Sequence, residues 1–199
     1  MIHPTPTKTL LTTTFESLVM QLSGLLARGT RLLERFVQSE PTPETTLAFE
    51  RELSALLREV GRRIMTWALN RLEPDADPEA PPRLSFEGRL YRRRRQHPHV
   101  VGTLFGPVTL WRRLYEPLGR RGRSIHPLEL RLGIEAGLAT PALAERIGYW
   151  GTEHTQNEVL EIVQRDHGVS WSCTSLRKLL GCLRAGMAPH REGAQVEQI

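Results

Sequence analysis

The chain has 199 residues, a formal net charge of +5 and 39% hydrophobic residues, a length that suits one large domain or two small ones. Its sequence pI of about 9.9 favours nucleic acid or another anionic surface as the partner. Charge interrupts every apolar run well before 18 residues, and residues 1–9 lack the apolar core of a signal peptide. We therefore expect no membrane partner and a cytoplasmic, nucleoid-associated location.

The N-terminal third predicts two helices. Residues 1–13 are rich in threonine and proline and are predicted to be disordered, whereas residues 14–73 predict a helical hairpin. Its second helix carries apolar residues at spacings of four, three, four, four and three, which form a narrow seam. These residues are Phe49, Leu53, Leu56, Val60, Ile64 and Trp67. Two uses of this 49–67 seam stay open, namely packing on the first helix and forming a homodimer.

A proline-rich stretch, residues 74–83, predicts a linker and a subdomain boundary. Residues 84–124 then predict an arginine-rich β-hairpin region, a small antiparallel sheet with arginines on one face. We expect His97-Pro98-His99 to separate the first two strands and Phe105-Gly106-Pro107 to form the following turn. From Arg83 to Arg123 there are eleven arginines and two glutamates, a local excess of nine positive charges. Charge this concentrated suits displacement of counterions from a nucleic-acid backbone.

Residues 125–186 predict a helical region containing a helix-turn-helix, followed by a tail at 187–199. Gln156–Val163 has an apolar face, Gly168 suits a tight turn, and Val169 is expected to fill the turn's apolar side. Small polar residues at the start of the last helix suit contact with base edges. An ordinary helical hairpin with a serine cap remains the alternative to the helix-turn-helix.

These patterns predict two sets of DNA-binding residues. The residues expected to contact phosphates are Arg92, Arg94, Arg112 and Arg113. The residues expected to read bases are Ser172, Thr174, Ser175, Arg177 and Lys178. The alternative for the strand arginines is a solvated face or protection of an edge strand.

No catalytic or metal site is predicted. Of the aspartates, Asp75 and Asp77 fall in the linker and Asp166 at a helix end, so none lies on an apolar strand where it would hold metal ions for strand chemistry. The histidines lack acidic or cysteine partners at ligand spacing. Cys173 and Cys182 lie nine residues apart on one predicted helix and point to opposite sides, so we expect them to be reduced.

The order of these segments resembles a group of bacterial insertion-sequence transposases, the Kra type. The resemblance lies in Thr103–Leu110 followed by Arg112, Arg113 and Tyr115, then in Pro127–Gly133, Thr140–Arg146 and Ser170–Leu176, and it spans roughly residues 45–190. It implies a region that recognises the inverted repeats at the ends of an element. In that group an RNase H-like domain with acidic residues and Mg²⁺ follows, and the chain ends at Ile199, about where that domain should begin.

We therefore expect an α+β fold with an N-terminal helical hairpin, a small antiparallel β-sheet and a C-terminal helical bundle with a helix-turn-helix. The expected function is double-stranded DNA binding by the N-terminal portion, or a truncated copy, of a transposase, with no cofactor and no enzymatic activity of its own. Two alternatives stay open: a free-standing helix-turn-helix regulator, and an oligomeric or non-functional remnant.

Overall fold

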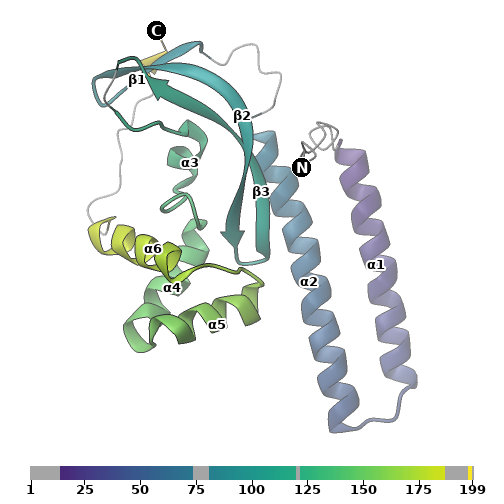
Figure 1. The fold of residues 1–199 in the computed structure, drawn as a ribbon. Coiled ribbons are helices and arrows are strands. Elements are labelled where there is room, and N and C mark those ends of the chain that lie inside the picture. Colours follow the sequence, from purple (N-terminus) through teal and green to yellow (C-terminus); the bar gives the residue numbers. More distant parts are fainter. Residues whose placement is uncertain (1–13, 74–80, 120–121, 187–196, 199) are drawn as a thin grey trace, which may run out of the picture. The chain divides into compact units, whose positions relative to one another are not determined.

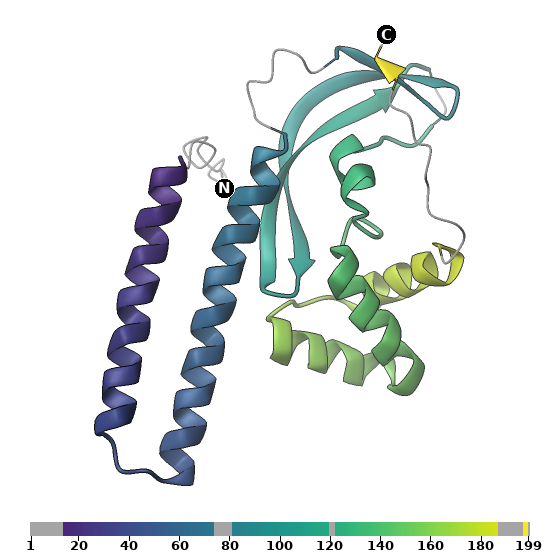
Figure 2. The same cartoon turned by 180° about the vertical axis from the view of Figure 1, so that it is seen from behind.

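The protein has an α+β fold, described here by a computed structural model that covers residues 14–73, 81–119, 122–186 and 197–198 (Figures 1 and 2). The chain divides into two compact units, Met1–Ala68 and Leu69–Ile199. The predicted disordered segment 1–13, most of the predicted linker 74–83 and most of the tail 187–199 lie outside the described residues. Within the described residues, no helix has both the length and the apolar character needed to cross a membrane.

Unit 1 consists of helix α1 (Phe15–Gln38) and most of helix α2 (Pro43–Arg71), which run antiparallel. The Thr14 hydroxyl caps α1 by accepting a hydrogen bond from the Ser17 N–H. Phe36 stacks on Phe49 at one end of the pair, with ring centroids 4.1 Å apart. At the other end Phe15 meets Trp67 edge to face at 5.7 Å.

The apolar seam of α2 packs against α1 of the same chain. Phe49 and Trp67 make the ring contacts with α1, and Leu56 is buried in the middle of the seam. A Cβ atom at Gly29 would lie 3.1 Å from the Leu56 side chain, so glycine lets the two helices approach closely here. The intrachain use of the 49–67 seam is therefore the one seen in this structure.

Unit 2 begins with an antiparallel sheet in the strand order β3-β2-β1-β4. The strands are β1 (Arg83–Phe86), β2 (Arg89–Thr103), β3 (Gly106–Pro117) and the two-residue β4 (Glu197–Gln198). Strands β2 and β3 pair from Tyr91–Pro117 to Thr103–Gly106, and the register shifts between Arg93 and Gln96. Such a β-bulge adds one residue to β2 and interrupts the alternation of its side chains between the two faces.

The predicted strand break at His97-Pro98-His99 is wrong, because β2 continues through it. Pro98 lies opposite Trp111, and the Trp111 N–H donates to the Asn70 side chain at 2.7 Å rather than to β2. The pair is therefore a non-hydrogen-bonded one in the ladder, where a residue without an N–H costs nothing. A proline is tolerated at this register position although its neighbours belong to a regular strand.

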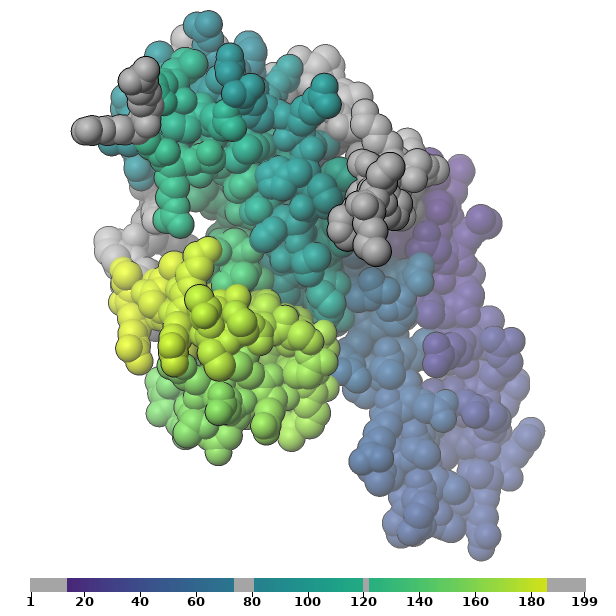
Figure 3. Space-filling model, viewed as in Figure 1, coloured from purple at the N-terminus to yellow at the C-terminus, as the bar shows by residue number. Residues whose placement is uncertain are grey.

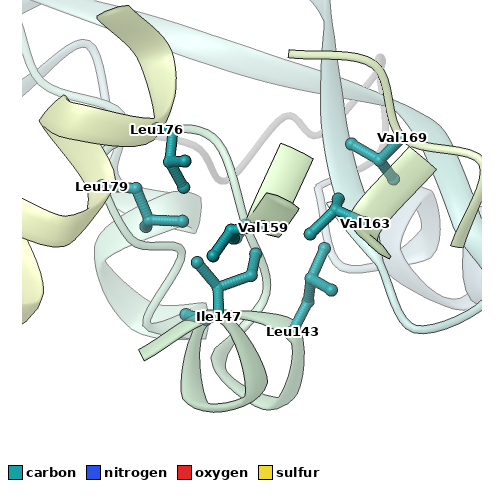
Figure 4. Packing of buried hydrophobic residues seen from close by; sticks show 9 residues of the cluster. Leu143, Ile147, Val159, Val163, Val169, Leu176 and Leu179 are labelled. Atoms are coloured by element: carbon teal, nitrogen blue, oxygen red, sulfur yellow. The ribbon is translucent and has the colours of Figure 1, made fainter. Parts of the chain in front are cut away.

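The remaining helices are α3 (Pro127–Leu132), α4 (Pro141–Glu153), α5 (Gln156–His167) and α6 (Cys173–Gly186). Ile125 and Leu130, from the segment around α3, pack on the buried sheet residues Leu84, Tyr91 and Tyr115. Helices α4, α5 and α6 contact one another and share a separate core (Figure 4). The large side chains of that core are Leu143, Ile147, Val159, Val163, Val169, Leu176 and Leu179.

The end of β2 is joined directly to this three-helix cluster. The Gly102 N–H donates to the Leu138 carbonyl at 2.7 Å, and the Gly102 carbonyl accepts from the Thr140 N–H at 3.0 Å. A Cβ atom at Gly102 would lie 2.9 Å from both Leu143 and Trp171. The strand therefore enters the cluster at a point with no room for a larger residue.

Candidate nucleic-acid interface

The connection between α5 and α6 is fixed by local interactions. Thr155 and Glu158 form a capping box at the start of α5, and α5 ends at Gly168, which has the left-handed φ of 64°. Val169 follows and is only 3% exposed within the three-helix core. The Ser172 hydroxyl then accepts the Ser175 N–H at 3.1 Å and so caps α6.

Helix α6 has one buried face and one exposed face. Leu176 and Leu179 are 0% exposed and point into the cluster. On the opposite side, the exposed residues from the helix start to Gly181 are Thr174, Arg177, Lys178 and Gly181, and Arg184 and Ala185 continue the exposed side at the helix end. Figure 3 shows this last helix, in yellow, at the surface of unit 2. We call Thr174, Arg177, Lys178 and Gly181 the α6 face.

The structure places the predicted base-reading residues in two groups. Thr174, Arg177 and Lys178 lie on the α6 face. The Ser172 and Ser175 hydroxyls instead lie 3.1 Å from each other at the helix start, where Ser172 serves as the cap. Three of the five residues thus lie on the exposed face of the helix, and the hydroxyls of the other two contact each other at its start.

The two cations of the α6 face are held by neutral groups. The Arg177 Nε donates to the Gln156 side-chain oxygen at 2.9 Å, and the Lys178 Nζ donates to the Ala136 carbonyl at 2.7 Å. Neither has a carboxylate partner among the residues that the structure describes. Their positive charge is therefore uncompensated on an otherwise small and polar surface.

The sheet carries a second group of exposed arginines. Of the nine described arginines between Arg83 and Arg123, seven are exposed, and these are Arg83, Arg89, Arg92, Arg93, Arg94, Arg95 and Arg123. Arg83 and Arg92 are direct partners across β1 and β2, an arrangement in which like charges repel. Glu116 faces Arg92 from β3 but pairs with Arg94 at 2.6 Å. A net positive row across three strands results.

Arg112 and Arg113 are not the exposed phosphate contacts that the sequence predicts. They are 8% and 6% exposed. Arg112 forms an ion pair with buried Glu129, and the Arg113 guanidinium lies 4.0 Å from a Glu73 carboxylate oxygen. The prediction that arginines gather on one face of the sheet is corrected accordingly, because tertiary contacts draw these two inside while the β2 arginines stay outside.

Three histidines surround Arg112, a grouping that the sequence analysis missed. The rings of His97 and His126 lie 5.1 Å apart, and the His99 Nε2 lies 2.6 Å from the Gly137 carbonyl, to which it donates. Burial, reinforced by the Arg112 charge, lowers the pKa of His126 to about 4. The same two causes lower the pKa of His97. These rings are neutral at pH 7, next to a cation that disfavours a bound metal.

The acidic residues weighed for metal chemistry do not converge in the described structure. Asp166 is exposed and pairs with Arg165 at 2.7 Å, while Asp75 and Asp77 lie outside the described residues. Among the residues that are described, no three His, Cys, Asp or Glu side chains gather as a metal site would require. Cys173 and Cys182 are free thiols.

Comparisons of the chain with protein-family models, with curated proteins and with solved structures gave no match.

Proposed function

We propose that this protein binds duplex DNA through α5 and α6, which act as a helix-turn-helix with the α6 face in the major groove. The observation that carries the proposal is the composition of that face. It combines Thr174, Arg177 and Lys178 above a fully buried apolar side, and no carboxylate neutralises its charge in the described structure. A helix of this kind, held rigidly by its apolar side and polar at its N-terminal end, suits base readout.

The arginine row of the sheet supplies contacts that do not depend on base sequence. A phosphate near Arg83 and Arg92 relieves the repulsion between these cross-strand neighbours. Arg92 and Arg94 remain in the proposed interface from the sequence analysis, and Arg83 joins them. Arg112 and Arg113 leave it because they are buried in ion pairs.

The biological setting proposed is recognition of the ends of an insertion sequence, as the N-terminal portion or a truncated copy of a transposase. The support is the order of the segments that resemble the Kra-type group, from Thr103–Leu110 to Ser170–Leu176. Binding and positioning are the roles proposed for this chain, and strand cleavage is assigned to none of its residues.

The test begins with selection of bound sequences from a random duplex pool by the full chain. Affinity for the selected duplex is then measured against salt concentration for the wild type and for three variants, Arg177→Ala, Lys178→Ala and Arg146→Ala. Arg146 is an exposed arginine on α4 and serves as the matched control. All four proteins are compared by circular dichroism first, so that loss of folding is recognised.

Arg177→Ala is expected to weaken binding by about 1–3 kcal/mol and to relax preference at one base position. Lys178→Ala, if it loses a phosphate contact, lowers the slope of log affinity against log salt by about one. Arg146→Ala should leave both quantities unchanged. Base readout by the α6 face is refuted if the selection yields no preferred sequence, or if all three variants lose the same affinity for the selected duplex.

A further inference from the structure

Unit 1 has more exposed than fully buried large hydrophobic residues. Three of its large hydrophobic residues are buried, namely Leu18, Leu32 and Leu56, whereas nine are exposed. Those nine are Phe15, Val19, Met20, Leu26, Leu33, Val37, Leu47, Leu57 and Ile64. Two helices alone form a single apolar contact, and stable helical domains cover such faces with a further layer.

Five of the exposed residues lie on one line along α1, and we call them the α1 stripe. They are Phe15, Val19, Leu26, Leu33 and Val37, each between 44% and 80% exposed. With 3.6 residues per helical turn, their positions fall within about 40° of arc. Leu18 and Leu32, which are buried, occupy a different direction about 100° away. Helix α1 thus has two apolar faces. Helix α2 covers the face with Leu18 and Leu32 and contacts the other through Phe15, which meets Trp67.

The stripe continues onto the same side of α2. Leu57 and Ile64 are 59% and 42% exposed, and they lie about 70° and 50° from the mean direction of the other five seam residues. Ile64 is thus the seam residue on the exposed side of α2. On each helix the exposed line lies in the direction of increasing helical angle from the face that contacts the other helix. Because the two helices are antiparallel, this places both exposed lines on the same side of the pair. Gly61 lies between these two residues on α2, and no charged residue of α1 lies within the stripe.

The positions of the α1 stripe along the helix are symmetric about Leu26. Counting from Leu26, the other members lie seven and eleven residues away in each direction. A second copy running antiparallel therefore sets Leu26 against Leu26, Val19 against Leu33, and Phe15 against Val37. A two-fold interface requires this property, since each residue must meet its counterpart twice.

The area of this face is also in the range of stable dimer interfaces. The 24 residues of α1 extend about 36 Å, and two helices side by side are about 20 Å wide, so the face measures about 700 Å² per copy. Stable interfaces bury about 800 Å² per partner. We infer that the α1 stripe, with Leu57 and Ile64, is the contact surface for a second copy of this chain, and that the two α1–α2 pairs form an antiparallel four-helix bundle.

This dimer surface shares only Ile64 with the 49–67 seam. It does not depend on the proposed DNA binding, because dimerisation is measured without DNA. Sedimentation equilibrium of the full chain is expected to give a dimer. Leu26→Glu introduces two charges at the two-fold axis and should raise the dimer Kd by about a hundredfold or more. Met20→Glu is the matched control, because Met20 is 75% exposed on α1 but lies outside the stripe.

Disulfide trapping tests the register independently of stability. In a chain with Cys173→Ser and Cys182→Ser, Leu26→Cys should form a covalent dimer under mild oxidation, since the residue meets itself at the axis. Met20→Cys should not. A monomeric wild type overturns the inference, as does equal dissociation by Leu26→Glu and Met20→Glu. A dimer in which Leu26→Cys fails to cross-link while Met20→Cys succeeds refutes the stripe as the contact.

Discussion

Removal of the Glu129 carboxylate is the sharpest available perturbation of unit 2. Arg112 and Glu129 form an ion pair in which the residues are each 8% exposed. The Arg112 Nε is buried and has no hydrogen-bond partner in the described structure, so Glu129 is the main compensation for the guanidinium. Burial lowers the pKa of Arg112 to about 10, so the group is still charged at pH 7. Glu129→Ala leaves that charge inside the protein without its partner.

The expected cost follows from the asymmetry of buried ion pairs. Removing one partner of a buried pair costs about 3–5 kcal/mol, because the remaining charge is not solvated. Replacing both by apolar residues of similar size, as in Arg112→Met with Glu129→Leu, is often close to neutral. Arg94 and Glu116 form an ion pair in the same unit at 2.6 Å, with side chains 45% and 40% exposed. Glu116→Ala should therefore cost about 1 kcal/mol or less.

Urea unfolding at pH 7, followed by tryptophan fluorescence, measures all three variants on one scale. Three of the four tryptophans, Trp111, Trp150 and Trp171, belong to unit 2 and report on it. We expect Glu129→Ala to be the least stable, with the double variant recovering most of the loss. If Glu129→Ala and Glu116→Ala lose similar stability, the burial argument for Arg112 is refuted, and Arg112 returns as a candidate phosphate contact.

Three further predictions concern unit 2. Gly181→Ala should stabilise the protein by about 1 kcal/mol, because a Cβ atom there meets nothing within 4 Å. If the α6 face enters a groove, the same methyl group should weaken DNA binding. Thermal unfolding measures the first effect and a binding titration the second. Gly102→Ala should lower the free energy of unfolding in urea by about 1–3 kcal/mol, since the new methyl group would lie 2.9 Å from buried Leu143 and from Trp171. An unchanged free energy would mean that these two side chains move aside at little cost. The pKa of His126 is about 4 in the folded protein, below its ordinary 6.5. Between these two values the unfolded chain is protonated at His126 and the folded protein is not, so the free energy of unfolding should fall by about 2 kcal/mol from pH 7 to pH 4.5. His126→Gln should flatten that pH profile, and an unchanged profile would assign the proton uptake to other groups.

The features that sequence predicted best depend on neighbours a few residues apart. The beginnings of α5 and α6 follow from Thr155 with Glu158 and from Ser172, and the end of α5 follows from Gly168. Each acts on backbone groups within one helical turn, so the pattern carries its own cause. The burial of Val169 follows equally from its place beside that glycine.

The errors concern contacts between distant segments. A proline in a β-rich region predicts a break unless one knows that Trp111 bonds to Asn70, 41 residues away in sequence. Likewise, a count of arginines along the chain does not reveal that Glu73 and Glu129 neutralise two of them inside the fold. The α1 stripe had a readable signal, since the apolar residues of α1 follow two lines rather than one. It was missed because a single amphipathic face accounts for most of them.

Residues at the end of α2 and just after it form hydrogen bonds with the outer edge of β3, so a fragment that lacks them would lose these bonds. Asn70 donates to the Thr109 carbonyl at 2.9 Å and accepts the Trp111 N–H, while Glu73 accepts the Arg113 N–H at 2.8 Å. These side chains stand in for a missing neighbouring strand. A fragment cut after the proline-rich stretch would leave a row of bare amides and carbonyls on β3, ready to recruit strands from other molecules and aggregate.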